Sequence, residues 1–144
     1  MFTKFLVPTD GSELSQRAIE GAVELAHKLG ARIVGVTVVE PYAYASLSEY
    51  RPETIAEYEQ RADQIAGERL AGLESRARHD GVPVETAISR SFSPYEAIID
   101  AAERHGCDVI FMASHGRRGL RAVLLGSETQ KVLTHSKIPV VVYR

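Results

Sequence analysis

The residues of this chain that are best suited to bind a ligand lie in the basic, glycine-bearing stretch 114–119, which follows an apolar run at 109–113. Nine residues separate Gly116 from Gly126-Ser127, where a helix pattern begins, with Ser127 as the predicted N-cap and Gln130 completing a capping box. Glycines at such a place let backbone N–H groups approach an anion, and the helix start adds unpaired N–H donors and a positive dipole end. The segment therefore predicts a phosphate ligand.

Two familiar phosphate motifs are excluded by the sequence. The segment lacks the Gly-Lys-Ser/Thr ending of a P-loop, and no Gly-x-Gly-x-x-Gly lies between a strand and a helix in the dinucleotide manner. The alternative to a phosphate site is an ordinary strand, turn and helix, which many α/β proteins contain without any ligand.

Four basic side chains accompany the glycines: His115, Arg117, Arg118 and Arg121. They would either pair with phosphate oxygens or lie solvated on a surface loop. Their place beside the predicted anion site favours the phosphate role for His115 and Arg117, whereas we expect Arg121 to be structural. Ser127 has two compatible roles, because a hydroxyl that caps a helix can also donate to a phosphate.

The composition restricts the class of protein. With 144 residues, of which 44% are hydrophobic, the chain fits one domain, 1–144, with its own core. A net charge of −2 argues against a dedicated nucleic-acid binder. The single cysteine, Cys107, cannot form an internal disulfide, and we expect a small buried residue in a reducing compartment. No long apolar run or signal segment precedes the first strand, which predicts a soluble, cytoplasmic protein without membrane contact.

Apolar patterns and turn residues predict five strands that alternate with four helices. The strands cover 4–8, 32–39, 84–90, 109–113 and 139–143, and the helices cover 12–29, 53–79, 93–104 and a segment from Ser127 onward. The β-branched run 32–39 is typical of a parallel strand covered on both faces, and the alternation over 84–90 indicates a strand nearer the sheet edge. This order implies right-handed crossovers and a mainly parallel sheet with helices on both faces.

Several local details belong to these elements. The apolar stripe of the first helix includes Leu25 and Leu29, and that of the second includes Ile55. Ser93 and Glu96 are expected to form a capping box, with Pro94 at the first helical position.

Three tyrosines, Tyr42, Tyr44 and Tyr50, lie in a stretch without clear periodicity between the second strand and the helix after it. Two interpretations stay open. The rings cover a bound ligand, or they pack on the domain edge as surface aromatics.

Ligands of an open doubly wound sheet bind outside the carboxyl ends of its strands, where successive strands are added on opposite sides of the first. Here those ends carry Pro8-Thr9-Asp10, Val38-Val39-Glu40 and the segment from Ala113 onward. If the first and fourth strands are neighbours, Asp10 lies beside the glycine loop. It would then accept hydrogen bonds from ribose hydroxyls, or alternatively cap the helix that begins near Ser12.

Five segments together resemble the universal stress protein family, over essentially the whole chain. They are Pro8-Thr9-Asp10-Gly11-Ser12, Val38-Val39-Glu40-Pro41, the stretch 113–120, Leu124-Leu125-Gly126-Ser127 and Pro139-Val140-Val141-Val142. The expected fold is a single-domain, doubly wound α/β structure. Its mainly parallel five-stranded sheet has the order 3-2-1-4-5, with helices on both faces.

The nucleotide-binding branch of that family is marked by a glycine, two residues, a second glycine, nine residues and then Gly-Ser or Gly-Thr. Gly116, Gly126 and Ser127 follow this spacing, whereas Ala113 stands in place of the first glycine. An added methyl at a strand end costs little if the backbone angles suit an L-residue, and otherwise it would crowd the ribose.

By resemblance, the ligand is ATP or another adenine nucleotide. Asp10 would hold the ribose, and the backbone at Thr9 and Val38 would meet the adenine. Gly116, Gly126 and Ser127 would hold the phosphates, with Mg²⁺ accompanying a triphosphate. The expected binding set also includes Pro8, Met112, Ala113, His115, Arg117, Arg118 and Glu128.

The resemblance also implies a homodimer in which the last strand, Ile138 to Tyr143, pairs with its copy across a two-fold axis. The physical argument agrees, because an apolar strand at a sheet edge is an aggregation hazard unless something covers it.

Three functions are compatible with these residues. The leading hypothesis is a nucleotide-binding stress or regulatory module, whose occupancy changes the order of the glycine loop and of 42–50, and so the binding of an unidentified regulatory protein. The second is an enzyme with at most weak ATP hydrolysis or phosphoryl transfer, because the site offers mainly Asp10, His115 and Ser127 and no carboxylate pair. The third is a nucleotide-free dimeric scaffold, which the methyl of Ala113 would favour.

Overall fold

Strands and helices alternate along the chain in the predicted order. The computed structural model describes residues 1–43, 53–117 and 125–144, so the predictions for Tyr44, Tyr50, Arg118 and Arg121 lie outside the described residues. The elements are β1 (Lys4–Pro8), α1 (Glu13–Leu29), β2 (Arg32–Val39), α3 (Ile55–His79), β3 (Val84–Arg90), α4 (Pro94–Arg104), β4 (Val109–Ala113), α5 (Ser127–His135) and β5 (Val140–Tyr143).

The five strands form one parallel sheet in the order β3-β2-β1-β4-β5, which confirms the predicted topology. β1 lies between β2 and β4, with Leu6 opposite both Val34 and Ile110. The chain therefore leaves β1 toward one side of the sheet and reaches β4 on the other. The loops that follow β1 and β4 are neighbours at the carboxyl edge, as the ligand-site argument requires.

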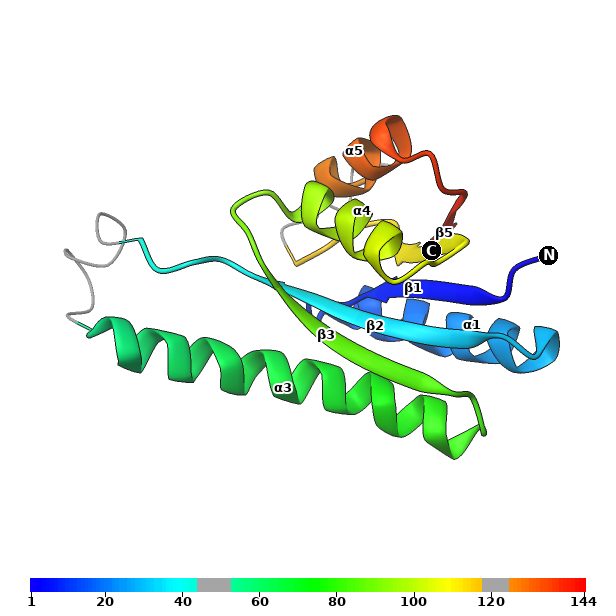
Figure 1. The fold of residues 1–144 in the computed structure, drawn as a ribbon, viewed down its shortest axis with the longest axis horizontal. Coiled ribbons are helices and arrows are strands. Elements are labelled where there is room, and N and C mark those ends of the chain that lie inside the picture. Colours follow the sequence, from blue (N-terminus) through cyan, green and yellow to red (C-terminus); the bar gives the residue numbers. More distant parts are fainter. Residues whose placement is uncertain (44–52, 118–124) are drawn as a thin grey trace.

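Each face of the sheet has its own apolar core, and alternate residues of a strand contribute to each (Figure 1). On one face α1 and α3 cover Phe5, Val7 and Ile33. On the other face α4 and α5 cover Leu6 and Val34. The β-branched strand β2 is buried on both sides, as predicted for an inner parallel strand.

Two residues assigned to apolar stripes are exposed. Leu29 is 48% exposed because it is the last residue of α1, where Gly30 ends the helix in the left-handed conformation. Ile55 is 56% exposed at the start of α3, a helix whose buried residues begin only at Ala66. Figure 1 shows that this first part of α3 projects past the body of the sheet.

The predicted capping box at α4 is wrong. Ser93 is the N-cap and Pro94 follows it, but the Ser93 side chain makes no capping hydrogen bond. The Tyr95 N–H instead donates to the Glu128 carboxylate at 2.9 Å, and Glu96 accepts from the Tyr95 hydroxyl. A carboxylate from α5 thus caps α4.

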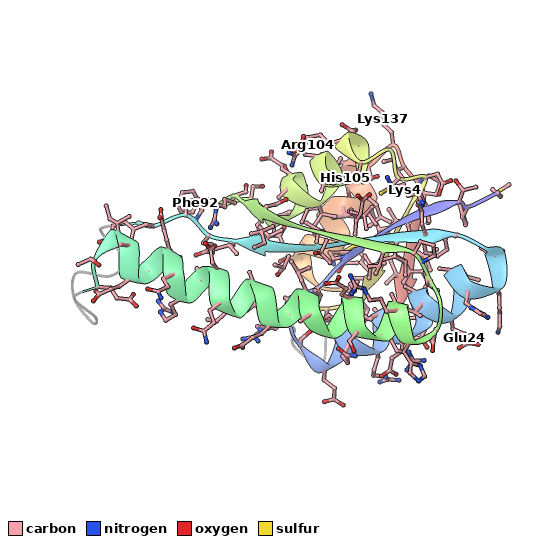
Figure 2. The ribbon with its side chains drawn as sticks, turned by 60° about the horizontal axis from the view of Figure 1, so that its bottom comes forward. Lys4, Glu24, Phe92, Arg104, His105 and Lys137 are labelled. Atoms are coloured by element: carbon pink, nitrogen blue, oxygen red, sulfur yellow. The ribbon has the colours of Figure 1, made fainter. Side chains whose placement is uncertain are left out.

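The amino edge of the sheet contains ion pairs. Glu85 lies 3.1 Å from Lys4 and 3.8 Å from His105, and Figure 2 places Lys4 and His105 far from Phe92, which follows the carboxyl end of β3. Cys107 is buried nearby, and burial raises the pKa of its thiol to about 11, as expected for an unreactive cysteine. Within the described ranges, no helix is long and apolar enough to cross a lipid bilayer.

Gly35 and Gly72 give a paired test of this packing. A Cβ on Gly35 would lie 2.8 Å from Cδ2 of the buried Leu73, whereas a Cβ on Gly72 would meet nothing within 4 Å. We expect Gly35→Ala to lower the free energy of unfolding by about 1–3 kcal/mol through overpacking. Gly72→Ala should raise it by roughly 0.5–1 kcal/mol, because alanine has a higher helix propensity than glycine at an exposed position within a helix. Urea denaturation measures both, and equal effects would contradict the close contact of β2 with α3.

Candidate functional site

The loop after β1 is fixed by short local hydrogen bonds. The Thr9 N–H donates to the Val36 carbonyl at 2.9 Å, and the Thr9 hydroxyl lies 3.1 Å from that of Ser15. Ser12 is the N-cap of α1 and accepts from the Ser15 N–H. Ser12 and not Asp10 is therefore the N-cap, while the Asp10 carboxylate accepts from the N–H of Ser12 itself.

Asp10 joins the β1 loop to the glycine loop after β4. One carboxylate oxygen, Oδ1, accepts from the Ser12 N–H at 2.9 Å, and Oδ2 accepts from the Arg117 N–H at 2.7 Å. The Arg117 guanidinium Nε also donates to the Asp10 backbone carbonyl at 2.7 Å. Because each carboxylate oxygen can accept two hydrogen bonds, Asp10 retains capacity for ligand hydroxyls.

The environment of Asp10 favours its charged form. Burial by itself would raise the pKa of this carboxyl, but hydrogen bonds from Ser12 and from the backbone of Arg117 outweigh burial and lower the pKa below its ordinary value of 3.8. Asp10 is therefore a carboxylate at neutral pH, and both of its oxygens can accept hydrogen bonds.

Glycine suits position 116 because the Asp10 carboxylate lies close to its backbone. A Cβ there would lie 2.7 Å from Oδ2 of Asp10, so a side chain would displace this carboxylate from the Arg117 amide or push the two loops apart. The methyl of Ala113, where the family pattern has glycine, is buried in the core beneath α1 and α3. No described residue other than glycine has a positive φ, so the backbone at Ala113 suits an L-residue.

Helix α5 begins at the end of this loop without a capping side chain. Gly126, not the predicted Ser127, is the N-cap, and its N–H donates to the Ser114 carbonyl at 2.8 Å. A Cβ on Gly126 would lie 3.3 Å from the His115 Cα, so a glycine allows the two ends of the loop to meet closely. Ser127 is then the first helical residue, and no described side chain accepts from the amides of the first turn.

The other three helices of the described residues differ from α5 in this respect. Side chains accept from first-turn amides at α1, through Ser12, at α3, through Thr54, and at α4, through Glu128. The uncapped amides of Ser127 and its two successors, at the positive dipole end, are a natural anion site. They lie at the end of β4, because the buried Thr129 hydroxyl donates to the Ala113 carbonyl at 3.1 Å.

The remaining predicted residues divide between the site and the core. His115 is half-buried, with its Nδ1 3.0 Å from the Ser114 hydroxyl. The Glu128 carboxylate is directed to α4 and to Lys131, which leaves its backbone at the site. Met112 is buried in the core beneath α4 and α5, and Val38 packs against the same core at the end of β2.

Tyr42 is the one predicted tyrosine that the structure describes. Its ring packs edge-on against the ring of Tyr58 in α3, with 5.5 Å between centroids. This contact agrees with the interpretation of a surface aromatic that packs within the domain, and a ligand-covering role is not needed to explain its place.

One cation near Asp10 was not identified from sequence. Arg69 lies on α3, and its Cγ and Nε would be 3.1 and 3.2 Å from a Cβ on Gly11, which follows Asp10. The charges of a long amphipathic helix normally form its solvated face. No sequence signal distinguishes Arg69 from the other arginines, because its position depends on how α3 packs against the sheet.

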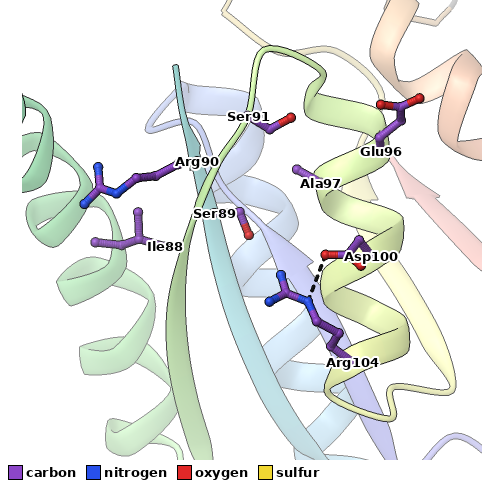
Figure 3. Close-up of a pocket in the computed structure, with 8 residues that line it drawn as sticks. All are labelled: Ile88, Ser89, Arg90, Ser91, Glu96, Ala97, Asp100 and Arg104. Carbon is purple, nitrogen blue, oxygen red and sulfur yellow. Dashed lines mark ion pairs between the residues drawn. The ribbon is translucent and has the colours of Figure 1, made fainter. Parts of the chain in front are cut away.

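A groove of about 410 Å³ lies elsewhere, between β3 and α4 (Figure 3). Its charged side chains already have protein partners: Arg104 pairs with Asp100, Arg90 with Asp63, and Glu96 accepts from Tyr95. The groove therefore has weaker chemical grounds for a ligand than the edge that Asp10 and α5 share. Among the described residues, no group of three or more His, Cys, Asp or Glu side chains is arranged to hold a metal ion.

The fold places the chain among the doubly wound, parallel α/β proteins, with a candidate site at the carboxyl ends of β1 and β4. The sequence profile of the universal stress protein family matches residues 1–144, and the chain belongs to that family. Universal stress protein MJ0531 of Methanocaldococcus jannaschii is 30% identical over 145 aligned positions, covering all of this chain and 83% of that protein.

Solved structures show the same fold. The structure of MJ0577, also from Methanocaldococcus jannaschii, has a TM-score of 0.83 and 28% identity, covering 99% of this chain and 95% of that one. A universal stress protein solved in complex with cAMP has a TM-score of 0.74 at 22% identity, with 99% and 97% of the two chains covered.

The pKa of Asp10 gives a test of its hydrogen bonds. Because the folded-state pKa is lowered, the carboxylate contributes stability above its ordinary value of 3.8 and loses this contribution as the pH falls through the lower folded value. We expect wild type to be more stable than Asp10→Asn above about pH 5, with the difference shrinking below about pH 4. Urea denaturation across this range measures it. Glu20→Gln, at an exposed position of α1, is the control, and a pH-independent difference for Asp10→Asn would contradict the assignment.

Proposed function

We propose that residues 1–144 act as one adenine-nucleotide-binding regulatory domain. One observation carries this proposal: a charged carboxylate, Asp10, and the uncapped amino end of α5 lie at the carboxyl ends of adjacent strands. The Arg117 amide joins Asp10 to the loop after β4, and the Gly126 amide joins the start of α5 to the same loop. A nucleotide offers ribose hydroxyls to the first group and phosphate oxygens to the second. The complex of a universal stress protein with cAMP supports an adenine nucleotide as the ligand class.

The protein's own hydrogen bonds refine the role of each group. The Thr9 N–H already donates to the Val36 carbonyl. The Thr9 carbonyl would therefore meet the adenine amino group, with the backbone of Val38 beside it. The Gly126 N–H already donates to the Ser114 carbonyl. The role of Gly126 would therefore be to leave room for the phosphates, because it has no side chain. The phosphates would then bind the amides from Ser127 onward and the Ser127 hydroxyl, beside Gly116.

ATP with Mg²⁺ is the form that we propose. Mg²⁺ is commonly held by one or two carboxylates together with substrate phosphates and water, and does not need a dedicated protein cage. Because Asp10 is assigned to the ribose and Glu128 is directed to α4, Mg²⁺ would here be held by the phosphate oxygens and water. The residues present fit a metal that arrives with the triphosphate, whose charge it would neutralise.

Regulation by nucleotide occupancy is favoured over turnover. Phosphoryl transfer needs a positioned base or nucleophile and a firmly held metal. The described site offers Asp10, held by Ser12 and Arg117, and His115, whose ring contacts Ser114. Retention of ATP without multiple turnover would support the regulatory role, and sustained hydrolysis would favour the enzyme instead.

The proposed dimer uses the free edge of β5. The N–H groups of Ile110 and Ser114 donate to the Pro139 and Tyr143 carbonyls. In a parallel ladder the alternate residue, Val142, then directs its N–H and C=O away from β4. Pairing of two copies of β5 across a two-fold axis would satisfy these groups and cover an apolar edge.

Gly126→Val tests the nucleotide site. A valine there would press on the His115 backbone and occupy space next to the amides of α5, so we expect adenine nucleotide binding to be lost with the fold retained. Native mass spectrometry of gently purified protein and ATP calorimetry measure this. Ala113→Gly is the matched control and should bind at least as well as wild type. Unchanged ATP affinity in Gly126→Val, or none in wild type, would refute the site.

Val142→Pro tests the dimer. Proline removes an outward-facing N–H without breaking the ladder to β4, so we expect a folded monomer. Thr86→Pro is the control, because the pairing of Ser91 with Val39 makes Thr86 the outward-facing residue of the other edge strand, β3. Light scattering after size exclusion should report a monomer for Val142→Pro and a dimer for Thr86→Pro and wild type. A dimeric Val142→Pro would place the interface elsewhere.

A further inference from the structure

Arg69, on α3, is a cation that the proposed function has not used. Its Nε is buried without a hydrogen-bond partner in the described structure, and no ion pair of its guanidinium is found among the described residues. Burial, and then the positive charge of Arg117, lower its pKa from the usual range, while Asp10 opposes the shift. A partly buried cation without a hydrogen-bond partner at its Nε is costly, so an acceptor supplied from outside the chain would be favoured there.

The side chains of Arg69 and Arg117 both lie next to one glycine, Gly11. Atoms of both side chains, Nη2 of Arg117 and Cγ of Arg69, would be 3.1 Å from a Cβ on Gly11. Gly11 follows Asp10, so two guanidinium groups and one carboxylate lie close together, with a formal net charge of +1. An anionic group complements this charge, whereas a lone metal cation would be repelled.

A second unsatisfied polar atom lies at the same level of the sheet. The Thr37 hydroxyl is buried, with 1% of the residue exposed, and has no hydrogen-bond partner in the described structure. Gly35 packs against Leu73, and β2 and α3 run in opposite directions. Thr37 lies two residues, about 7 Å, beyond Gly35 along β2, and Arg69 lies four residues, about 6 Å, before Leu73 along α3. Thr37 and Arg69 are therefore at the same level of the sheet. The Thr37 hydroxyl and the Arg69 Nε, both without partners among the described residues, therefore lie between α3 and the sheet, toward its carboxyl edge.

We propose that Arg69, together with Arg117, binds a phosphate group of the ligand that Asp10 holds. The inference rests on the proposed function and deepens it, because it adds a residue from α3 to a site otherwise built from the loops after β1 and β4. Planar guanidinium groups suit phosphate oxygens, and a buried charge-assisted hydrogen bond is a strong one. The phosphate belongs to the nucleotide itself or to a second phosphorylated compound, and the experiment separates these sources.

The test compares Arg69→Met with Arg78→Met by calorimetry against ATP, AMP and adenosine. Methionine keeps an apolar stem beside Gly11 and removes the charge. Arg78 is the control because it lies on the same helix, is 71% exposed and pairs with Glu74. We expect Arg69→Met to weaken ATP about tenfold and adenosine by less than about twofold. Arg78→Met should bind all three like wild type, and the melting temperature of Arg69→Met should be unchanged or higher.

The outcomes are distinguishable. If wild type binds no adenine nucleotide, the proposed function fails. If wild type binds ATP and Arg69→Met binds both ATP and pyrophosphate as wild type does, the proposed function stands and this inference is overturned. An equal loss for adenosine would also overturn it, because Arg69 would then contact the nucleoside. Pyrophosphate binding to ATP-saturated wild type, absent from Arg69→Met, would support a second phosphorylated compound as the source, and a loss confined to ATP and AMP would support the nucleotide.

Discussion

The hydrogen bond from the Arg117 amide to the Asp10 carboxylate is the interaction on which the carboxyl edge depends. It joins two loops that are 107 residues apart in sequence and adjacent only because β1 and β4 pair. The bond requires a bare backbone at Gly116, since a Cβ would lie 2.7 Å from the carboxylate. The Gly126 amide closes the same loop on Ser114. Together these contacts keep the acceptor, Asp10, and the donors at the start of α5 in a fixed relation.

Much of the fold could be predicted because its signals are local and repeated. The apolar runs, the turn residues and the β-branched strand β2 gave the element order, and the family resemblance supported the sheet order that the structure confirms. The capping errors have a tertiary cause. Glu128, 33 residues away, takes the place of the Ser93 side chain at α4. At α5, Gly126 occupies the cap position that the Ser127 and Gln130 pattern assigned one residue later.

The candidate site was predictable to the extent that glycines and polar residues directly follow strands. Asp10, Gly116 and Gly126 could be identified in this way, but their hydrogen-bond partners could not, because these depend on which loops meet. Arg69 shows the limit most clearly. Its position beside Gly11 follows from the register between β2 and α3, and nothing in the charge pattern of a long amphipathic helix sets it apart from arginines that lie in water.

Unsatisfied polar groups are concentrated at one edge of this protein. The two buried side-chain atoms without a partner in the described structure belong to Thr37 and Arg69, and both lie on the face covered by α3. At the carboxyl end of β4, α5 is the described helix whose first turn lacks a side-chain acceptor. Such groups cost stability wherever they occur, and the other three helix starts show that this chain caps its amides elsewhere. A ligand with hydroxyl and phosphate groups would supply the missing partners, so the same omissions that weaken the free protein would strengthen its complex.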